Sequence, residues 1–189
     1  MKQGKSLKVM TILGTRPEII RLSRVLPKMD GYFRHVMVYT RQSYDYELSD
    51  IFFKELELRK PDYLLDVKSD TLGGQIANII KQSEDVLRRE LPDALLVLGD
   101  TNSSLSAIVA KRMHIPIFHM EAGNRSFDWD VPEEVNRRIV DHISDYNLAY
   151  TEHARRYLLA EGIPGQTVFV TGSPYAEIFA HFGEKIEAN

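Results

Sequence analysis

Short apolar runs alternate with longer segments of helical period along the whole chain. The runs are apolar at successive positions, a pattern typical of strands that are covered on both faces. They predict strands at residues 8–13, 36–39, 94–98, 117–120, 146–149 and 168–170. The intervening segments predict helices at residues 18–29, 46–56, 72–90, 102–113, 132–143 and 152–161. Regular alternation of strands and helices predicts an α/β fold with a doubly wound parallel sheet.

Signals at the ends of these segments support the same organisation. Pro132, followed by Glu133 and Glu134, suits the first turn of a helix, where acidic side chains meet the positive end of the helix dipole. The Ser-Pro step at 173–174 opens a further helix. No linker-like stretch interrupts the pattern, so we expect one domain over residues 1–182 and a frayed polar tail over residues 183–189.

Composition narrows the class of protein. The 189 residues are 43% apolar and 27% charged, as in an ordinary globular domain. The net charge of −3 argues against a nucleic-acid-binding module, which would be basic. The absence of cysteine rules out disulfides and thiolate metal sites and fits a reducing compartment. The apolar runs are too short to span a bilayer, and the polar N-terminus does not have the pattern of a signal peptide. We therefore expect a cytoplasmic protein with no membrane partner.

The turn after the first predicted strand has the sequence Gly-Thr-Arg-Pro-Glu over residues 14–18. A glycine turn that leads into a helix exposes backbone N–H groups, which predicts an anion site, and Arg16 adds a guanidinium suited to phosphate. A tight turn with a capping box between Thr15 and Glu18 accounts for the turn equally well. That second interpretation leaves Arg16 and Arg21 without a role, and both interpretations stay open.

Three acidic residues lie close to the ends of predicted buried strands. Asp100 follows the strand at 94–98, Glu121 follows the strand at 117–120, and Glu133 stands at the start of a helix. The carboxyl ends of parallel strands form the usual ligand-binding edge of such sheets. Acids beside arginines at this edge suit a site that holds an anionic substrate and moves a proton.

Simpler interpretations exist for the same residues. Asp100 can cap the helix that follows it. Glu133 and Glu134 each have an arginine four residues later, and such pairs contribute about 0.2–0.5 kcal/mol. His119 is more typical of a buried histidine with satisfied hydrogen bonds than of a ligand. A metal site built from Asp100, His119 and Glu121 has no supporting spacing motif, so we predict no metal.

Five ordered segments of the chain carry a resemblance to a known family. They are Gly14–Glu18, Thr40–Ser43, Gly99–Thr101, Glu121–Arg125 and Pro132–Arg138. In order and spacing they resemble the non-hydrolysing UDP-N-acetylglucosamine 2-epimerase family, and the resemblance extends from Lys8 to about Phe182. Within the family, residues 121–128, 140–142 and 151–157 resemble a capsule and O-antigen subgroup that forms UDP-N-acetyl-L-fucosamine.

The resemblance implies the Rossmann-like N-terminal half of a two-domain fold of the glycosyltransferase-B type. Family members are about twice this length, which fits two domains of the usual 100–200 residues each. The resemblance therefore leads us to expect that the given sequence lacks the family's C-terminal domain. In the family that domain supplies most of the UDP contacts and a catalytic histidine. Family members are usually homodimers and use no redox cofactor. The implied partners are a UDP-sugar, the missing domain and a second copy of the chain, with no cofactor.

The reaction implied by the resemblance inverts C2 of a UDP-N-acetylhexosamine. The C2 proton is removed, UDP leaves C1 to give a 2-acetamidoglycal, and UDP adds back while the opposite face of C2 is protonated. Inversion needs acid/base groups on both faces with separated pKa values. Asp100, Glu121 and Glu133 match the three acidic positions of the family. The resemblance assigns acid/base catalysis to them jointly, without deciding which residue acts on which face of C2. The implied substrate-binding residues are Arg16, Arg21, Arg125 and Gln42.

Departures from the family pattern keep other functions open. Arg21 replaces a lysine, Arg41 a glycine and Ser43 a histidine. These changes leave the sugar and any allosteric UDP-sugar site undecided. We expect the chain to be half of an epimerase and to be inactive on its own. The alternatives are a UDP-sugar-binding or interaction domain without catalysis, and a hydrolysing epimerase or glycosyltransferase-B relative.

Overall fold

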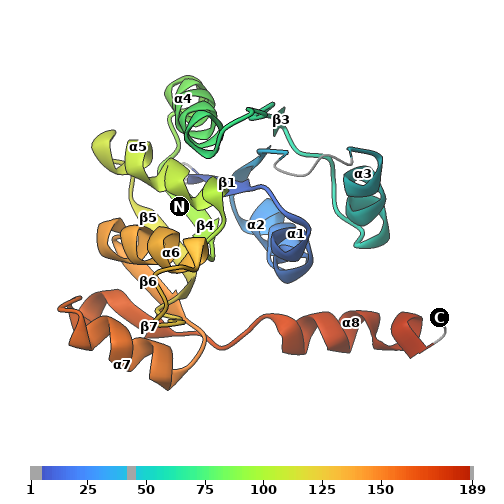
Figure 1. Ribbon diagram of the computed structural model, residues 1–189. Coiled ribbons are helices and arrows are strands. Elements are labelled where there is room, and N and C mark those ends of the chain that lie inside the picture. The colour runs from blue at the N-terminus through green and yellow to red at the C-terminus, as the bar shows by residue number, and fades with distance from the viewer. Residues whose placement is uncertain (1–5, 42–45, 188–189) are drawn as a thin grey trace, which may run out of the picture.

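A seven-stranded parallel sheet forms the centre of the molecule (Figure 1). The computed structural model describes residues 6–41 and 46–187. The strand order is β3-β2-β1-β4-β5-β6-β7, the doubly wound arrangement that the sequence predicts. The strands are β1 (Lys8–Leu13), β2 (Arg34–Tyr39), β3 (Tyr63–Leu64), β4 (Ala94–Leu98), β5 (Ile117–Ala122), β6 (Tyr146–Ala149) and β7 (Val168–Val170).

Helices cover both faces of the sheet. Figure 1 shows α4, α5 and α6 on one side and α1, α2 and α3 on the other. On the α1 side the helices are α1 (Arg16–Leu22), α2 (Leu26–Tyr32) and α3 (Tyr46–Glu55). The remaining helices are α4 (Leu72–Glu90), the 3-10 helix η1 (Asn102–Ser106), α5 (Ala107–Arg112), α6 (Pro132–Ile143), α7 (Glu152–Ala160), the 3-10 helix η2 (Gly165–Thr167) and α8 (Tyr175–Glu187).

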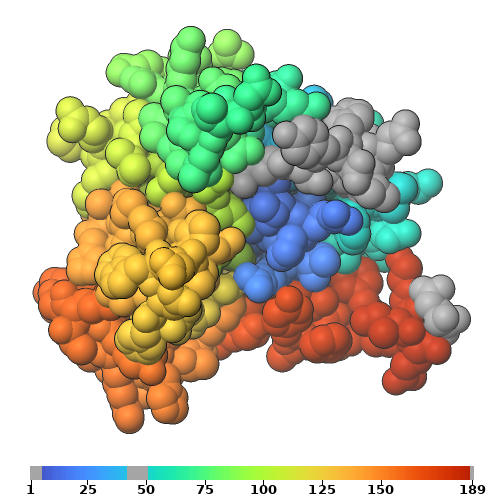
Figure 2. All heavy atoms as spheres, in the orientation of Figure 1, coloured from blue at the N-terminus to red at the C-terminus, as the bar shows by residue number. Residues whose placement is uncertain are grey.

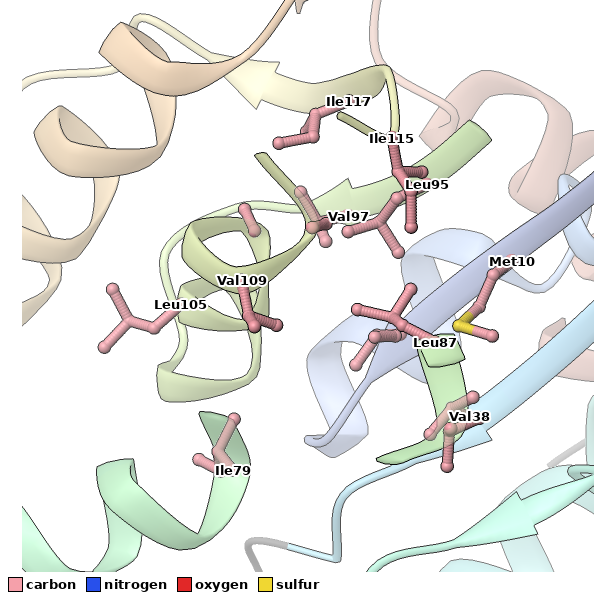
Figure 3. Close-up of a cluster of buried hydrophobic side chains, with 14 of the residues drawn as sticks. Met10, Val38, Ile79, Leu87, Leu95, Val97, Leu105, Val109, Ile115 and Ile117 are labelled. Carbon is pink, nitrogen blue, oxygen red and sulfur yellow. The ribbon is translucent and has the colours of Figure 1, made fainter. Parts of the chain in front are cut away.

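Apolar side chains fill the space between the sheet and each helical layer. One cluster joins β1, β2, β4 and β5 to α4 and α5, and Figure 3 shows Met10, Leu95 and Ile117 from the strands facing Leu87 from α4. A second cluster joins the opposite face of the sheet to α1, α2 and α3. Both faces of the central strands are therefore largely covered, which is why these strands have continuous apolar runs.

Several elements differ from the sequence-based expectation. The helix predicted at residues 18–29 is two helices, because Pro27 cannot donate the hydrogen bond that would continue α1 into α2. The segment predicted as a helix from residue 102 begins as the 3-10 helix η1. β3 escaped prediction because two residues are too few to show a period. α8 continues to Glu187, across the boundary expected at residue 182.

The C-terminal helix α8 returns across the molecule toward α3. Lys28 Nζ of α2 donates to Glu177 Oε2 of α8 at 2.6 Å, and Lys185 Nζ of α8 donates to the carbonyl of Glu55 at the end of α3. Figure 2 shows the red atoms of this helix lying against the blue atoms of the N-terminal segment. None of the helices in the described part of the chain is long and apolar enough to cross a membrane.

Candidate functional site

The three predicted acids come together where β4 and β5 end and α6 begins. A cavity of about 210 Å³ opens between these elements. Helix α6 begins with Pro132 at its first turn, which places two acidic side chains beside free backbone N–H groups. The cavity is lined by Asp100, Asn124, Arg125, Ser126, Val131, Glu133, Glu134 and Arg137.

Glu121 occupies an irregular position in the sheet. Its backbone has φ +62°, in the left-handed region, and the pairing register between β5 and β6 shifts at this residue. A bulge of this kind turns a side chain away from its regular direction and is common beside active sites. The Glu121 carboxylate consequently meets α1, where Oε2 accepts a hydrogen bond from Arg21 Nη1 at 2.6 Å.

Arg137 of α6 joins two of the predicted acids. Its Nη2 donates to Asp100 Oδ2 and lies 3.4 Å from Glu121 Oε1, while its Nη1 donates to the backbone carbonyl of Glu121. Only 7% of the Arg137 side chain is exposed. The pairing of Glu133 with Arg137 that the spacing suggested does not form. Sequence reasoning missed this role of Arg137, since its partners lie 16 and 37 residues away.

The backbone at Asp100 is held by a chain of amide side chains. Asn136 Nδ2 donates to the Asp100 carbonyl at 2.9 Å and to Asn102 Oδ1 at 3.0 Å. Asn102 in turn donates to Gln75 of α4. Thr101, rather than Asp100, is the N-cap residue of η1. The Asp100 carboxylate therefore does not cap a helix but points to Arg137, with 21% of its side chain exposed.

The neighbours Glu133 and Glu134 have opposite surroundings. Glu134 is buried and accepts hydrogen bonds from the Ser126 backbone N–H at 2.8 Å and from Arg138 Nε at 2.8 Å. This i,i+4 pair confirms the expected spacing. Although burial opposes ionisation, these bonds lower the pKa of Glu134. Glu133 is exposed, lines the cavity, and makes no hydrogen bond or ion pair within the described residues.

Arg125 lies in a second, closed charge cluster. Its guanidinium has no exposed surface and donates to Asp141 Oδ2 at 2.7 Å and to both carboxylate oxygens of Glu161. His119 is also fully buried, with Nε2 2.7 Å from the Gly99 carbonyl and Nδ1 2.9 Å from Asp141 Oδ1. The expectation of a hydrogen-bonded buried histidine is confirmed. A substrate-binding role for Arg125 stays a prediction, and its contacts in this structure are all within the protein.

The turn after β1 differs from a free anion site. The backbone N–H groups of Gly14 and Thr15 donate to Glu18 Oε2 at 3.0 and 2.8 Å, so the protein's own carboxylate occupies these donors. The capping box is confirmed. Arg16 is exposed, with its guanidinium carbon 5.8 Å from the centre of the Phe52 ring. Gln42 lies outside the described residues.

One further polar group faces the cluster. The Tyr150 hydroxyl, just beyond β6, is buried without a hydrogen-bond partner in the described part of the chain. Burial and the Glu121 carboxylate raise the pKa of Tyr150, so its hydroxyl keeps its proton. An enclosed donor without a partner costs about 1–3 kcal/mol, which marks it as a group that a ligand or water would satisfy.

Solved structures share the fold of this chain. The structure of UDP-N-acetylglucosamine 2-epimerase from Rickettsia bellii is 54% identical with a TM-score of 0.93, covering 98% of this chain and 50% of that one. The Methanocaldococcus jannaschii UDP-GlcNAc 2-epimerase, solved with UDP-GlcNAc and UDP, is 40% identical with a TM-score of 0.92, covering 97% of this chain and 51% of that one. The predicted Rossmann-like half of a two-domain fold is confirmed.

Sequence comparison gives the same result. The Pseudomonas aeruginosa UDP-2,3-diacetamido-2,3-dideoxy-D-glucuronate 2-epimerase is 40% identical, covering 82% of this chain and 45% of that protein. The chain spans about half the length of the curated relatives it matches. The profile described as UDP-N-acetylglucosamine 2-epimerase matches residues 28–189. On this evidence the chain belongs to the UDP-N-acetylglucosamine 2-epimerase family.

Proposed function

We propose that this chain supplies the acid/base half of a UDP-N-acetylhexosamine 2-epimerase. The observation that carries the proposal is that Asp100 and Glu133 line one cavity. The guanidinium of Arg137, which also lines it, joins Asp100 to Glu121. Three carboxylates with different surroundings are what a reaction needs when it moves protons on two faces of one carbon.

The proposed chemistry balances without a cofactor. One carboxylate takes the C2 proton, the C2–H electron pair forms the C1–C2 double bond, and the C1–O bond breaks with its electrons leaving on UDP. In the return step a UDP oxygen forms the C1–O bond while a second carboxylic acid gives its proton to the opposite face of C2. Exchange of these acidic protons with water restores both groups.

Two arginines of α1 suit the diphosphate of such a substrate. Arg16 is exposed at the start of α1, and Arg21 is part-exposed beside Glu121. The neutral Tyr150 hydroxyl adds a hydrogen-bond donor to the same region. The relatives named above act on UDP-linked amino sugars, which supports the substrate class without choosing one sugar. A cytoplasmic location, a homodimer and a place in capsule or O-antigen synthesis follow from the sequence resemblance and stay predictions.

Deuterium wash-in at C2 tests the proposal. The chain would be mixed in D₂O with the separately produced half of the Rickettsia bellii relative that this chain does not cover, and UDP-GlcNAc followed by NMR. We expect wash-in by the mixture, negligible wash-in by either part, and loss of wash-in with Glu121→Gln. Fast wash-in by the chain alone would contradict the half-site, and binding without wash-in by a well-assembled mixture would favour a binding domain. Free N-acetylmannosamine would indicate a hydrolysing relative.

A further inference from the structure

The planar guanidinium of Arg137 contacts three oxygen-bearing groups of two residues. Its guanidinium contacts the carboxylate of Asp100, the carboxylate of Glu121 and the backbone carbonyl of Glu121. Asp100 lies just beyond β4 and Glu121 lies in β5, while Arg137 comes from α6. Pairing of the two strands as far as Leu98 and Met120 sets their backbones side by side. The guanidinium then fixes the two carboxylates relative to each other.

The backbone contact acts on a strained residue. A non-glycine residue at φ +62° is held in a conformation that costs of the order of 1–2 kcal/mol. Such conformations persist only where the surroundings over-determine them. The bond from Arg137 to the Glu121 carbonyl, together with the Arg21 pair on the Glu121 carboxylate, holds the bulge in the direction that brings this carboxylate into the cluster.

The backbone that carries Arg137 is also fixed. Its neighbour Asn136 is bonded to the Asp100 carbonyl and to Asn102, so α6 is tied to the end of β4 immediately beside Arg137. The Arg137 side chain is almost fully buried, which leaves it little freedom to adopt other rotamers. A lysine ammonium is a single point and has no planar fork with which to contact all three oxygens at once.

The charges around Arg137 distinguish Glu133 from the other two acids. Arg137 and Arg21 contribute two positive charges against the carboxylates of Asp100 and Glu121. Glu133 is exposed at the cavity and has no cation among the described residues. The site thus ties two carboxylates to guanidinium groups and leaves the third without a partner among the described residues.

We propose that Arg137 is a positioning residue that sets the separation of Asp100 and Glu121, and so the two proton-transfer directions at the substrate. This inference rests on the proposed function. Arg137 acts through the two carboxylates, and only 7% of its side chain is exposed, so its loss disturbs the chemical step more than the binding of the UDP-sugar. Misplacement of a reacting group by about 1 Å costs roughly 100-fold in rate.

The kinetic test uses the assembled mixture described above, with Arg137→Lys and Arg137→Ala in the full chain. We expect kcat to fall roughly 100-fold with KM changed far less, and guanidinium chloride to restore part of the activity of Arg137→Ala. Arg138→Lys is the matched control, because Arg138 is the next residue of α6 and pairs with Glu134 and Glu161 instead. A kcat for Arg137→Lys equal to that of Arg138→Lys would overturn the proposal.

A second measurement on the chain itself separates this proposal from the proposed function. In ¹⁵N-labelled chain, the guanidinium signals of Arg137 should move with either Asp100→Asn or Glu121→Gln, while those of Arg138 stay unchanged. Circular dichroism would confirm that each variant is folded. If the Arg137 signals move but the wild-type mixture is inactive, the positioning geometry stands and the epimerase function is rejected. Signals that move with neither variant would reject the role of Arg137.

Discussion

Two charge clusters lie on either side of the Glu121–Gly123 turn, and they are built from the same residue types. In the open cluster, Arg137 contacts Asp100 and Glu121, and one fifth of the Asp100 side chain remains exposed beside a cavity. In the closed cluster, Arg125 and Asp141 have no exposed side-chain surface. The difference teaches that exposed carboxylate surface, rather than the presence of ion pairs, separates groups available for chemistry from groups that support the fold.

The closed cluster supports the open one. Asp141 accepts hydrogen bonds from the backbone N–H of Gly123 at 3.2 and 3.3 Å, two residues after Glu121. Gly123 has φ +80°, and a Cβ there would lie 2.5 Å from the carbonyl of Ala154. Only glycine fits this approach of the turn to α7. The closed cluster thus fixes the backbone from which the Glu121 carboxylate extends.

The largest stability effect is expected from breaking the closed cluster with Arg125→Met. Removing this guanidinium leaves Asp141 buried with one cation fewer and Glu161 without its main partner, and loss of one member of a buried pair costs about 3–5 kcal/mol. Urea unfolding would measure the loss. The control Arg155→Met removes an exposed pair with Glu152, worth less than about 1 kcal/mol. Equal effects of the two changes would contradict the comparison.

A smaller effect, with its own pH dependence, is expected at Glu18. Burial raises the pKa of Glu18 from 4.5 to about 7, against the opposing hydrogen bonds of the turn. The folded chain then keeps a proton that the unfolded chain releases above pH 4.5. This stabilisation is complete below pH 4.5 and is lost as the pH rises through about 7, a change of about 3 kcal/mol.

The measurement compares unfolding of the wild type and Glu18→Gln across this pH range. Glutamine keeps a capping side chain but does not titrate, so the difference between the two proteins should vary with pH by about 3 kcal/mol. Asp141 shows the opposite pH dependence. Burial opposes its ionisation, but the His119 hydrogen bond and the Arg125 charge lower the pKa of Asp141 overall. The contribution of Asp141 to the free energy of unfolding is therefore lost as the pH falls. A pH-independent difference would show that Glu18 is ionised in the folded chain.

The smallest effect compares two adjacent residues of α6. Glu134→Gln replaces a buried carboxylate that accepts hydrogen bonds from Ser126 and Arg138. We expect it to lower the free energy of unfolding by roughly 1–3 kcal/mol. Glu133→Gln changes an exposed side chain without partners among the described residues, and should stay within about 0.5 kcal/mol. Thermal unfolding would measure both. A larger loss for Glu133→Gln than for Glu134→Gln would contradict the description of Glu133 as an exposed side chain without structural partners.

Local patterns predicted much of the fold and part of the site. Six of the strands follow from apolar runs, and the capping box at Thr15 follows from spacing. Of the two interpretations left open at Gly14, the capping box holds, because the same spacing lets the Glu18 carboxylate take those N–H donors. The choice between the two interpretations depends on whether the Glu18 side chain folds back onto the turn, and residue spacing alone does not determine that conformation.

The sequence by itself determined the strand–helix order, the buried faces and the placement of acids at strand ends, because these depend on local periodicity. The tertiary structure alone decided which arginine meets which acid. Arg137 turns to residues 16 and 37 positions away rather than to Glu133 in the preceding turn, and Arg125 turns inward to Asp141. Those choices depend on how α6 packs against the ends of β4 and β5, where burial makes a paired charge far more favourable than an unpaired one.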